Sequence, residues 1–134
     1  DDGRILMVEI MDNNKKILLI AIYAPNENQE AFYRKLHTQI VKLDYSNIYM
    51  MGDLNGIVDG KLDYKTQTIT KKIRKTLPKT FFRMTDELNL KDVWRERNIS
   101  KRQYTFYSNR HLSWSRIDMI WMSADLLFNI QDIE

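Results

Sequence analysis

Apolar runs separated by short polar breaks open the chain and predict a β-hairpin. Residues 4–11 and 16–23 are two largely apolar runs, and Asp12, Asn13 and Asn14 lie between them. Because Asp and Asn are common turn residues, the two runs are expected to pair as antiparallel strands. Pro25 cannot donate to a strand ladder, so the second strand must end before it.

A helix and a third strand are predicted next. Residues 28–43 carry apolar side chains at spacings of four and three, which is typical of an amphipathic helix packing one stripe on a sheet. These apolar positions are Phe32, Leu36, Ile40 and Leu43. The almost wholly apolar run 47–51 then predicts a buried strand. Strand, helix and strand in this order predict a crossover that brings the ends of both strands to one edge, where ligands of α/β sheets gather.

The rest of the chain has a weaker pattern. Residues 56–75 predict a loop around Asp59 and Gly60 and then a polar stretch rich in Thr and Lys. The remaining predicted elements are a helix from Pro78 to Asn89, a short turn over 90–95, strands over 104–107 and 117–122 joined by a loop over 108–113, and a short helix over 124–128.

Polar side chains stand at the ends of three predicted strands. Asp53 and Asn55 follow the third strand, and in extended geometry both would project from one face. Tyr23 and Asn26 lie near the end of the second strand. Asp118 interrupts an apolar, aromatic run, where a carboxylate costs free energy unless it is paired or used. We therefore expect these groups to form one site on a sheet.

The Asp53–Asn55 pair suits phosphate chemistry. A carboxylate can activate water or hold a hard cation, while a neutral amide fixes an oxygen. Gly52, which precedes the pair, permits a sharp exit of the chain or a close backbone approach by a ligand. The alternative is an ordinary strand-to-loop turn, since Gly, Asp and Asn are all turn residues.

Three motifs carry a resemblance to a known family. Tyr-Ala-Pro-Asn at 23–26, Gly-Asp-Leu-Asn at 52–55 and Ser-Arg-Ile-Asp at 115–118, in this order, resemble the exonuclease-endonuclease-phosphatase superfamily. The chain is most similar to the endonuclease domain of long-interspersed-element retrotransposon ORF2 proteins, relatives of the apurinic/apyrimidinic endonucleases. Tyr-Thr-Phe-Tyr-Ser at 104–108 points to that branch. The resemblance implies a partial four-layer α/β sandwich, with mixed sheets flanked by helices.

The resemblance also implies roles for individual residues. The counterpart of Asp53 acts on the attacking water, and that of Asn55 helps to position the water and the phosphate. The hydroxyl of a tyrosine matching Tyr23 meets the scissile phosphate. The counterpart of Asp118 orients a catalytic histidine. Plain alternatives are turn chemistry for Asp53 and Asn55, packing for Tyr23, and an ion pair of Asp118 with Arg116 or another base.

Four further residues are implied to bind substrate. Asn26 lies beside the tyrosine motif, and Thr105 matches a position near bound DNA. Arg110 and His111 belong to a loop that reaches into the DNA minor groove in retroelement endonucleases. Turn chemistry for Asn26 and ordinary strand packing for Thr105 are the alternatives.

Several family features do not match this sequence. The metal-site asparagine, the metal-binding glutamate of a Gln-Glu-Thr-like segment and the histidine of a Ser-Asp-His segment have no counterpart, and neither His37 nor His111 replaces that histidine. We therefore interpret residues 1–134 as a single incomplete domain, the central to C-terminal portion of the fold, and expect it to be inactive alone. The complete domain is expected to nick DNA with Mg²⁺, with Mn²⁺ as the alternative cation.

Composition and charge exclude only a few classes of protein and of functional site. The 134 residues are 43% hydrophobic, with no cysteine, which excludes disulfides and thiolate metal sites. No apolar run could span a membrane, so we expect an intracellular protein, nuclear or cytoplasmic and not secreted. The formal charge of +3 is small, but basic residues crowd one stretch that could contact a phosphate backbone or simply be solvated. They are Lys61, Lys65, Lys71, Lys72, Arg74, Lys75 and Lys79.

Two other functions stay open at this point. The motifs are compatible with a superfamily phosphatase or phospholipase acting on small or lipid phosphates. A non-catalytic retroelement remnant that folds poorly or only binds is the third possibility, because missing outer strands would leave sheet edges and an apolar face uncovered.

Overall fold

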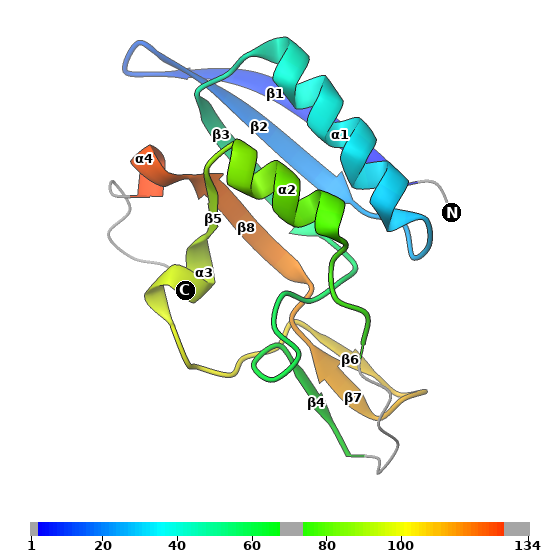
Figure 1. Ribbon diagram of the computed structural model, residues 1–134. Helices are drawn as coiled ribbons and strands as arrows, with labels where there is room; N and C mark the ends of the chain where they lie inside the picture. Colours follow the sequence, from blue (N-terminus) through cyan, green and yellow to red (C-terminus); the bar gives the residue numbers. More distant parts are fainter. Residues whose placement is uncertain (1–2, 68–73, 128–134) are drawn as a thin grey trace.

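Two β-sheets and four helices make up the fold in a computed structural model, which describes residues 3–67 and 74–127 (Figure 1). The elements are β1 (Arg4–Asp12), β2 (Lys15–Tyr23), α1 (Gln29–Leu43), β3 (Asn47–Asp53), β4 (Tyr64–Thr66), α2 (Lys79–Glu87), β5 (Leu90–Asp92), α3 (Val93–Arg97), β6 (Phe106–Ser108), β7 (Ser113–Ser115), β8 (Asp118–Ser123) and α4 (Ala124–Leu127). A five-stranded mixed sheet has the order β1-β2-β3-β8-β5, and a three-stranded sheet has the order β4-β7-β6. The predicted mixed α/β class is confirmed.

The hairpin and the crossover form as predicted. β1 and β2 are antiparallel, and Asn13 and Asn14 in their turn both have positive φ angles, 50° and 67°. Asn tolerates this left-handed backbone, and two such residues in a row match the twist of paired strands. β2 and β3 are parallel and α1 connects them, so both strands end at the same edge of the sheet.

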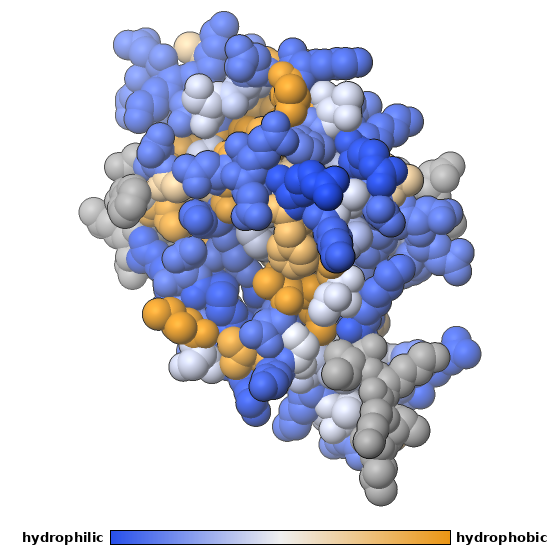
Figure 2. All heavy atoms as spheres, in the orientation of Figure 1, coloured by the Kyte–Doolittle hydropathy of each residue, from blue (hydrophilic) through white to orange (hydrophobic). Residues whose placement is uncertain are grey.

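The main core lies between one face of the large sheet and the helices α1 and α2 (Figure 1). The helix α1 buries Tyr33, Leu36 and Ile40. The predicted stripe is confirmed at Leu36, at Ile40 and at Phe32, which is half-buried and packs against this core, but it was wrong at Leu43, which is 47% exposed. Hydrophilic residues predominate over the outer surface of the two helices (Figure 2), which fits helices with one buried stripe.

The opposite face of the large sheet is largely open. Cross-strand partners share a face, and Leu6, Ala21, Met51 and Ile120 form one such row across β1, β2, β3 and β8. Leu6 is 63% exposed and Ile120 is 41% exposed. The helices α3 and α4 pack against strand β8 of this sheet, close to Met122. An apolar strip of sheet surface therefore runs from β1 toward β8.

The region after residue 103 differs from its prediction. We expected strands over 104–107 and 117–122, but β6 begins at Phe106 and its partner is β7. The apolar run 113–122 is divided at Arg116 and Ile117, with β7 in the small sheet and β8 in the large one. No Pro or Gly marks this division, so the local sequence does not reveal it.

Smaller differences concern short elements. β4 lies in a stretch predicted to be a loop, and β5 and α3 replace the turn predicted over 90–95. The predicted helix over 124–128 is present as α4, and residue 128 lies outside the described residues, as do Lys71 and Lys72. None of the described helices is long and apolar enough to cross a membrane.

Candidate active site

Tyr23, Asp53 and Asp118 lie side by side at one edge of the large sheet. In the register of the sheet, Tyr23 of β2 is the partner of Asp53 of β3, and Asp53 is the partner of Asp118 of β8. Tyr23 and Asp118 are exposed and Asp53 is half-buried. The three groups thus converge as the sequence predicted, although their chemical roles remain predictions.

Gly52 allows β3 to reach Asp53 while staying close to β2. Its φ of 133° lies in a region that favours glycine, and a Cβ on it would stand 2.0 Å from the Ile22 carbonyl oxygen. Any side chain would therefore push β3 away from β2. The close approach at Gly52 is made by a neighbouring strand, and the approach of a ligand stays a prediction.

The Asn55 side chain is not aligned with Asp53 along an extended strand, so that prediction was wrong. Asn55 has a left-handed φ of 54°, and its N–H donates to Oδ1 of Asp53 at 2.9 Å. Its Nδ2 donates to the Ala24 carbonyl at 3.0 Å. Asp53 and Asn55 therefore close a tight turn, and Asn55 also ties the end of β3 to the segment after β2.

Two residues of α1, Gln29 and Tyr33, donate hydrogen bonds to the backbone of this turn, and sequence analysis missed both. Nε2 of Gln29 donates to the carbonyl oxygens of Pro25 and Asn55, at 2.9 and 2.7 Å. The hydroxyl of Tyr33 donates to the Leu54 carbonyl at 2.8 Å. Both side chains are buried, so their hydrogen bonds fix the two motifs relative to each other. A polar Gln in the first turn of an otherwise apolar helix stripe was the available signal.

Thr105 positions the backbone of Asp118. Its Oγ1 accepts hydrogen bonds from the N–H groups of Ile117 and Asp118, both at 3.1 Å. The Ile117 carbonyl accepts from the Leu54 N–H at 2.9 Å, which joins the start of β8 to the Asp53 turn. A direct contact of Thr105 with DNA remains a prediction.

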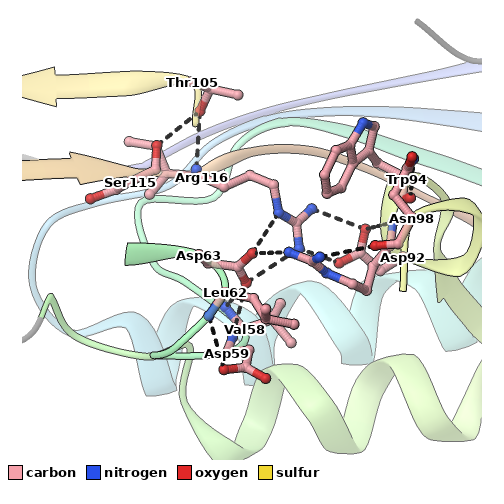
Figure 3. Close-up of polar contacts among 12 residues, drawn as sticks. Val58, Asp59, Leu62, Asp63, Asp92, Trp94, Asn98, Thr105, Ser115 and Arg116 are labelled. Carbon is pink, nitrogen blue, oxygen red and sulfur yellow. Dashed lines mark hydrogen bonds and ion pairs between the residues drawn. The ribbon is translucent and has the colours of Figure 1, made fainter. Parts of the chain in front are cut away.

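Arg116 does not pair with Asp118, so that alternative was wrong. Its guanidinium lies between two buried carboxylates (Figure 3). It donates to Asp63 at 2.8 and 3.3 Å and to Asp92 at 3.1 and 2.6 Å. Asp63 also accepts from Arg95. We call these four residues the Arg116 cluster.

The Arg116 cluster joins three segments of the chain, one of which leads directly into β8 and Asp118. Asp63 precedes β4, Asp92 ends β5, and Arg116 links β7 to β8. Burial would raise the pKa of Asp63, but hydrogen bonds from Arg116, from the Asp59 N–H and from Arg95 outweigh it and lower that pKa. Trp94 covers the cluster, with its ring centre 5.5 Å from the Arg116 guanidinium carbon.

Asp53 has a raised pKa for two physical reasons. Burial raises it most, and the negative charge of Asp118 raises it further. The hydrogen bond from the Asn55 N–H and the positive charge of Arg74 act in the opposite direction without cancelling the increase. A carboxylate that holds its proton more tightly than usual beside a second carboxylate is typical of functional sites.

Arg74 is a third residue that sequence analysis did not single out as a site residue. Its Nη2 donates to Oδ1 of Asn55 at 2.7 Å, and its guanidinium carbon lies 5.5 Å from the Phe106 ring centre. The basic stretch thus brings a cation to the candidate site.

The side chains of the other sequence-predicted residues make no hydrogen bond to this polar network within the described part of the chain. Asn26 is exposed in the segment between β2 and α1. Arg110 and His111 are exposed in the turn between β6 and β7, where the His111 N–H donates to Ser108. His37 faces Glu87 of α2, with Nε2 and Oε2 2.7 Å apart, so it takes no part in the site.

Metal binding is only partly supported by the residues present. Asp53 and Asp118 supply hard oxygen ligands that suit Mg²⁺. Within residues 3–67 and 74–127, however, no group of three or more His, Cys, Asp or Glu side chains could hold a metal ion. These residues by themselves therefore do not fit a complete magnesium site.

Comparison with known proteins places this geometry in context. No protein-family model matches the chain. An uncharacterised 149 kDa protein of transposon TX1 from Xenopus laevis is 28% identical over 133 residues, and the match covers 96% of this chain and 10% of that protein.

Solved structures share the fold. An AP endonuclease from Archaeoglobus fulgidus matches with a TM-score of 0.67 and 20% identity, over 91% of this chain and 54% of that one. The endonuclease domain of TRAS1, a telomere-specific non-LTR retrotransposon, matches with a TM-score of 0.64 and 16% identity, over 96% of this chain and 54% of that one. The chain therefore spans about half the length of these solved relatives and a tenth of the transposon protein.

Proposed function

We propose that this chain is part of a phosphodiesterase domain that nicks DNA in its complete form. The premise is that the chain has the fold of the exonuclease-endonuclease-phosphatase superfamily. The observation that carries the proposal is the row of Tyr23, Asp53 and Asp118 across three adjacent strands. The similarity to a transposon protein supports a retroelement origin, and an intracellular location, nuclear or cytoplasmic, is part of the proposal.

The side chains of this row can divide the work of phosphodiester hydrolysis. The exposed hydroxyl of Tyr23 can donate to a phosphate oxygen, and Asp53 can accept the proton of an attacking water. Asp118 has no hydrogen-bonding or ionic partner for its carboxylate among the described residues, so it is available to orient a group from outside this chain. The Thr105 hydrogen bonds hold its backbone in place for that purpose.

Magnesium belongs to the proposal as a cofactor of the complete domain. When bound, it would offset negative charge on the phosphate. Asp53 and Asp118 are the residues here that could contribute ligands, and the remainder must come from elsewhere. For this reason we propose that the isolated chain does not nick DNA.

The test compares the isolated chain with a complete domain, in which the flanking segments of the TRAS1 endonuclease domain are joined to this chain. Nicking of supercoiled plasmid is followed with and without Mg²⁺. We expect Mg²⁺-dependent nicking by the complete domain only, and its loss in Asp53→Ala and Asp118→Ala. An exposed carboxylate of α2, Asp86, serves as the matched control in Asp86→Ala.

Two results would count against the proposal. Nicking by the complete domain that survives Asp53→Ala would show that the row is not the active site. Robust nicking by the isolated chain that disappears in Asp53→Ala would show that the chain is sufficient alone. Release of phosphate from an inositol phosphate, without nicking, would favour the phosphatase alternative.

A further inference from the structure

Arg74 is held at the candidate site by two contacts from different sheets. Asn55, which accepts its Nη2 hydrogen bond, follows β3 of the large sheet. Phe106, whose ring faces the guanidinium, begins β6 of the small sheet. A guanidinium on an aromatic ring and a hydrogen bond to an amide together restrict a long side chain to one place.

The guanidinium of Arg74 makes no direct ion pair with a carboxylate of the described residues. Arg95 and Arg116 form ion pairs with Asp63 and Asp92, but Arg74 has no ion pair among the described residues. Its Nε is buried without an acceptor there. Arginine has five N–H donors in a planar fork, so most of its capacity is available for an acceptor that residues 3–67 and 74–127 do not supply.

The surrounding charges explain why an anionic ligand suits this place. The positive charge of Arg74 reaches Asp53, whose proton affinity it lowers. A phosphate diester that approaches Asp53 and Asp118 would be repelled by both carboxylates, and a fixed cation beside them offsets that repulsion. Arginine matches the geometry of phosphate oxygens better than lysine does.

We propose that Arg74 binds the DNA phosphate that lies at the Asp53 site, with Asn55 and Phe106 holding its guanidinium in position. The inference rests on the proposed function and adds a substrate contact to it. Arg74 binds the substrate through its remaining N–H donors, while Asn55 serves to position Arg74.

The test measures binding of the full 134-residue chain to a fluorescent DNA duplex, across a series of salt concentrations and without divalent metal. For Arg74→Gln we expect about tenfold weaker binding at low salt, as for one lost charge-assisted hydrogen bond. The slope of log affinity against log salt should fall by about one. Arg74→Lys, which keeps the charge, should retain the slope and lose part of the affinity.

Arg83→Gln is the matched control. Arg83 is exposed on α2, which covers the opposite face of the sheet, and its replacement removes the same charge. We expect its affinity to stay within about twofold of the wild type, as for one distant surface charge.

A second measurement needs no mutation. DNA should slow the reaction of Arg74 with an arginine-specific dicarbonyl reagent severalfold, read by mass spectrometry, and should leave Arg83 unchanged. If the wild-type chain binds DNA but neither Arg74→Gln nor the protection experiment shows an effect, the Arg74 contact is wrong and the proposed function stands. If the wild-type chain does not bind DNA at all, the Arg74 contact is wrong, and nicking by the complete domain decides the proposed function separately.

Discussion

Two carboxylates on adjacent strands dominate the candidate site at the scale of single residues. Asp53 and Asp118 are cross-strand partners, and the charge of Asp118 makes Asp53 harder to ionise. The positive charge of Arg74 has the opposite effect and makes Asp53 easier to ionise. The proton affinity of Asp53 therefore reports the positions of both neighbours.

The first prediction concerns the pKa of Asp53. Asp118→Asn removes a negative charge and should lower this pKa, whereas Arg74→Gln removes a positive charge and should raise it. Carboxyl ¹³C NMR of the Asp53 side chain during a pH titration measures both changes. Asp86→Asn, an exposed site on α2, is the control and should leave it unmoved. A pKa that moves in the same direction in both variants would contradict this arrangement.

At the scale of elements, the Arg116 cluster decides where β8 starts. The chain leaves the small sheet after β7 and enters the large sheet at Asp118. Arg116 lies in the segment that links β7 to β8. Its two carboxylate partners come from the segment before β4 and from the end of β5. The cluster thus fixes the crossing point between the two sheets.

The second prediction tests this cluster. Asp63→Asn should destabilise the fold by roughly 3–5 kcal/mol, because it leaves the buried Arg116 without one of its charged partners. Urea unfolding at neutral pH measures the loss. Asp86→Asn should stay within about 0.5 kcal/mol of the wild type.

The same variant has a defined pH dependence. Because the folded-state pKa of Asp63 is lowered, its ionised form contributes stability above the ordinary aspartate pKa of about 4. This contribution is lost as the pH falls through the folded-state pKa. The gap in unfolding free energy between wild type and Asp63→Asn should therefore narrow on acidification. A gap that widens toward low pH would contradict the role of the ionised carboxylate.

At the scale of the whole molecule, the two faces of the large sheet differ sharply. One face is covered by α1 and α2 over a continuous core. On the other, the row from Leu6 to Ile120 leaves apolar side chains in contact with water. The row of Tyr23, Asp53 and Asp118 follows at the end of this open face, so whatever covers the strip would also border the candidate site.

The third prediction concerns this open strip. The chain should bind a hydrophobic dye such as ANS in its folded state, since exposed apolar patches of this kind attract apolar ligands. Leu6→Ser should reduce the dye fluorescence and change the unfolding free energy by only about 0.5 kcal/mol. Leu18→Ser, on the covered face, should cost about 3 kcal/mol or more. Dye binding that Leu6→Ser leaves unchanged would show that the strip is not the binding surface.

Local patterns were sufficient for most elements and for part of the site. The hairpin, α1, β3 and α2 follow from apolar spacing and turn residues, which depend on short stretches of chain. The convergence of Tyr23 and Asp53 also follows, because a crossover between parallel strands brings their ends to one edge. Each of these predictions needs only neighbouring elements.

The division of the run 113–122 and the positions of Arg74, Asn55 and Arg116 needed the tertiary structure. Each depends on which distant segments meet, and nothing local distinguishes β7 from β8 or a paired arginine from a free one. The sequence by itself determined the elements and their order, because periodicity and turn chemistry act over a few residues. Only the folded chain decided which carboxylates are neutralised and which stay available, because that depends on burial and on contacts between residues far apart in the sequence.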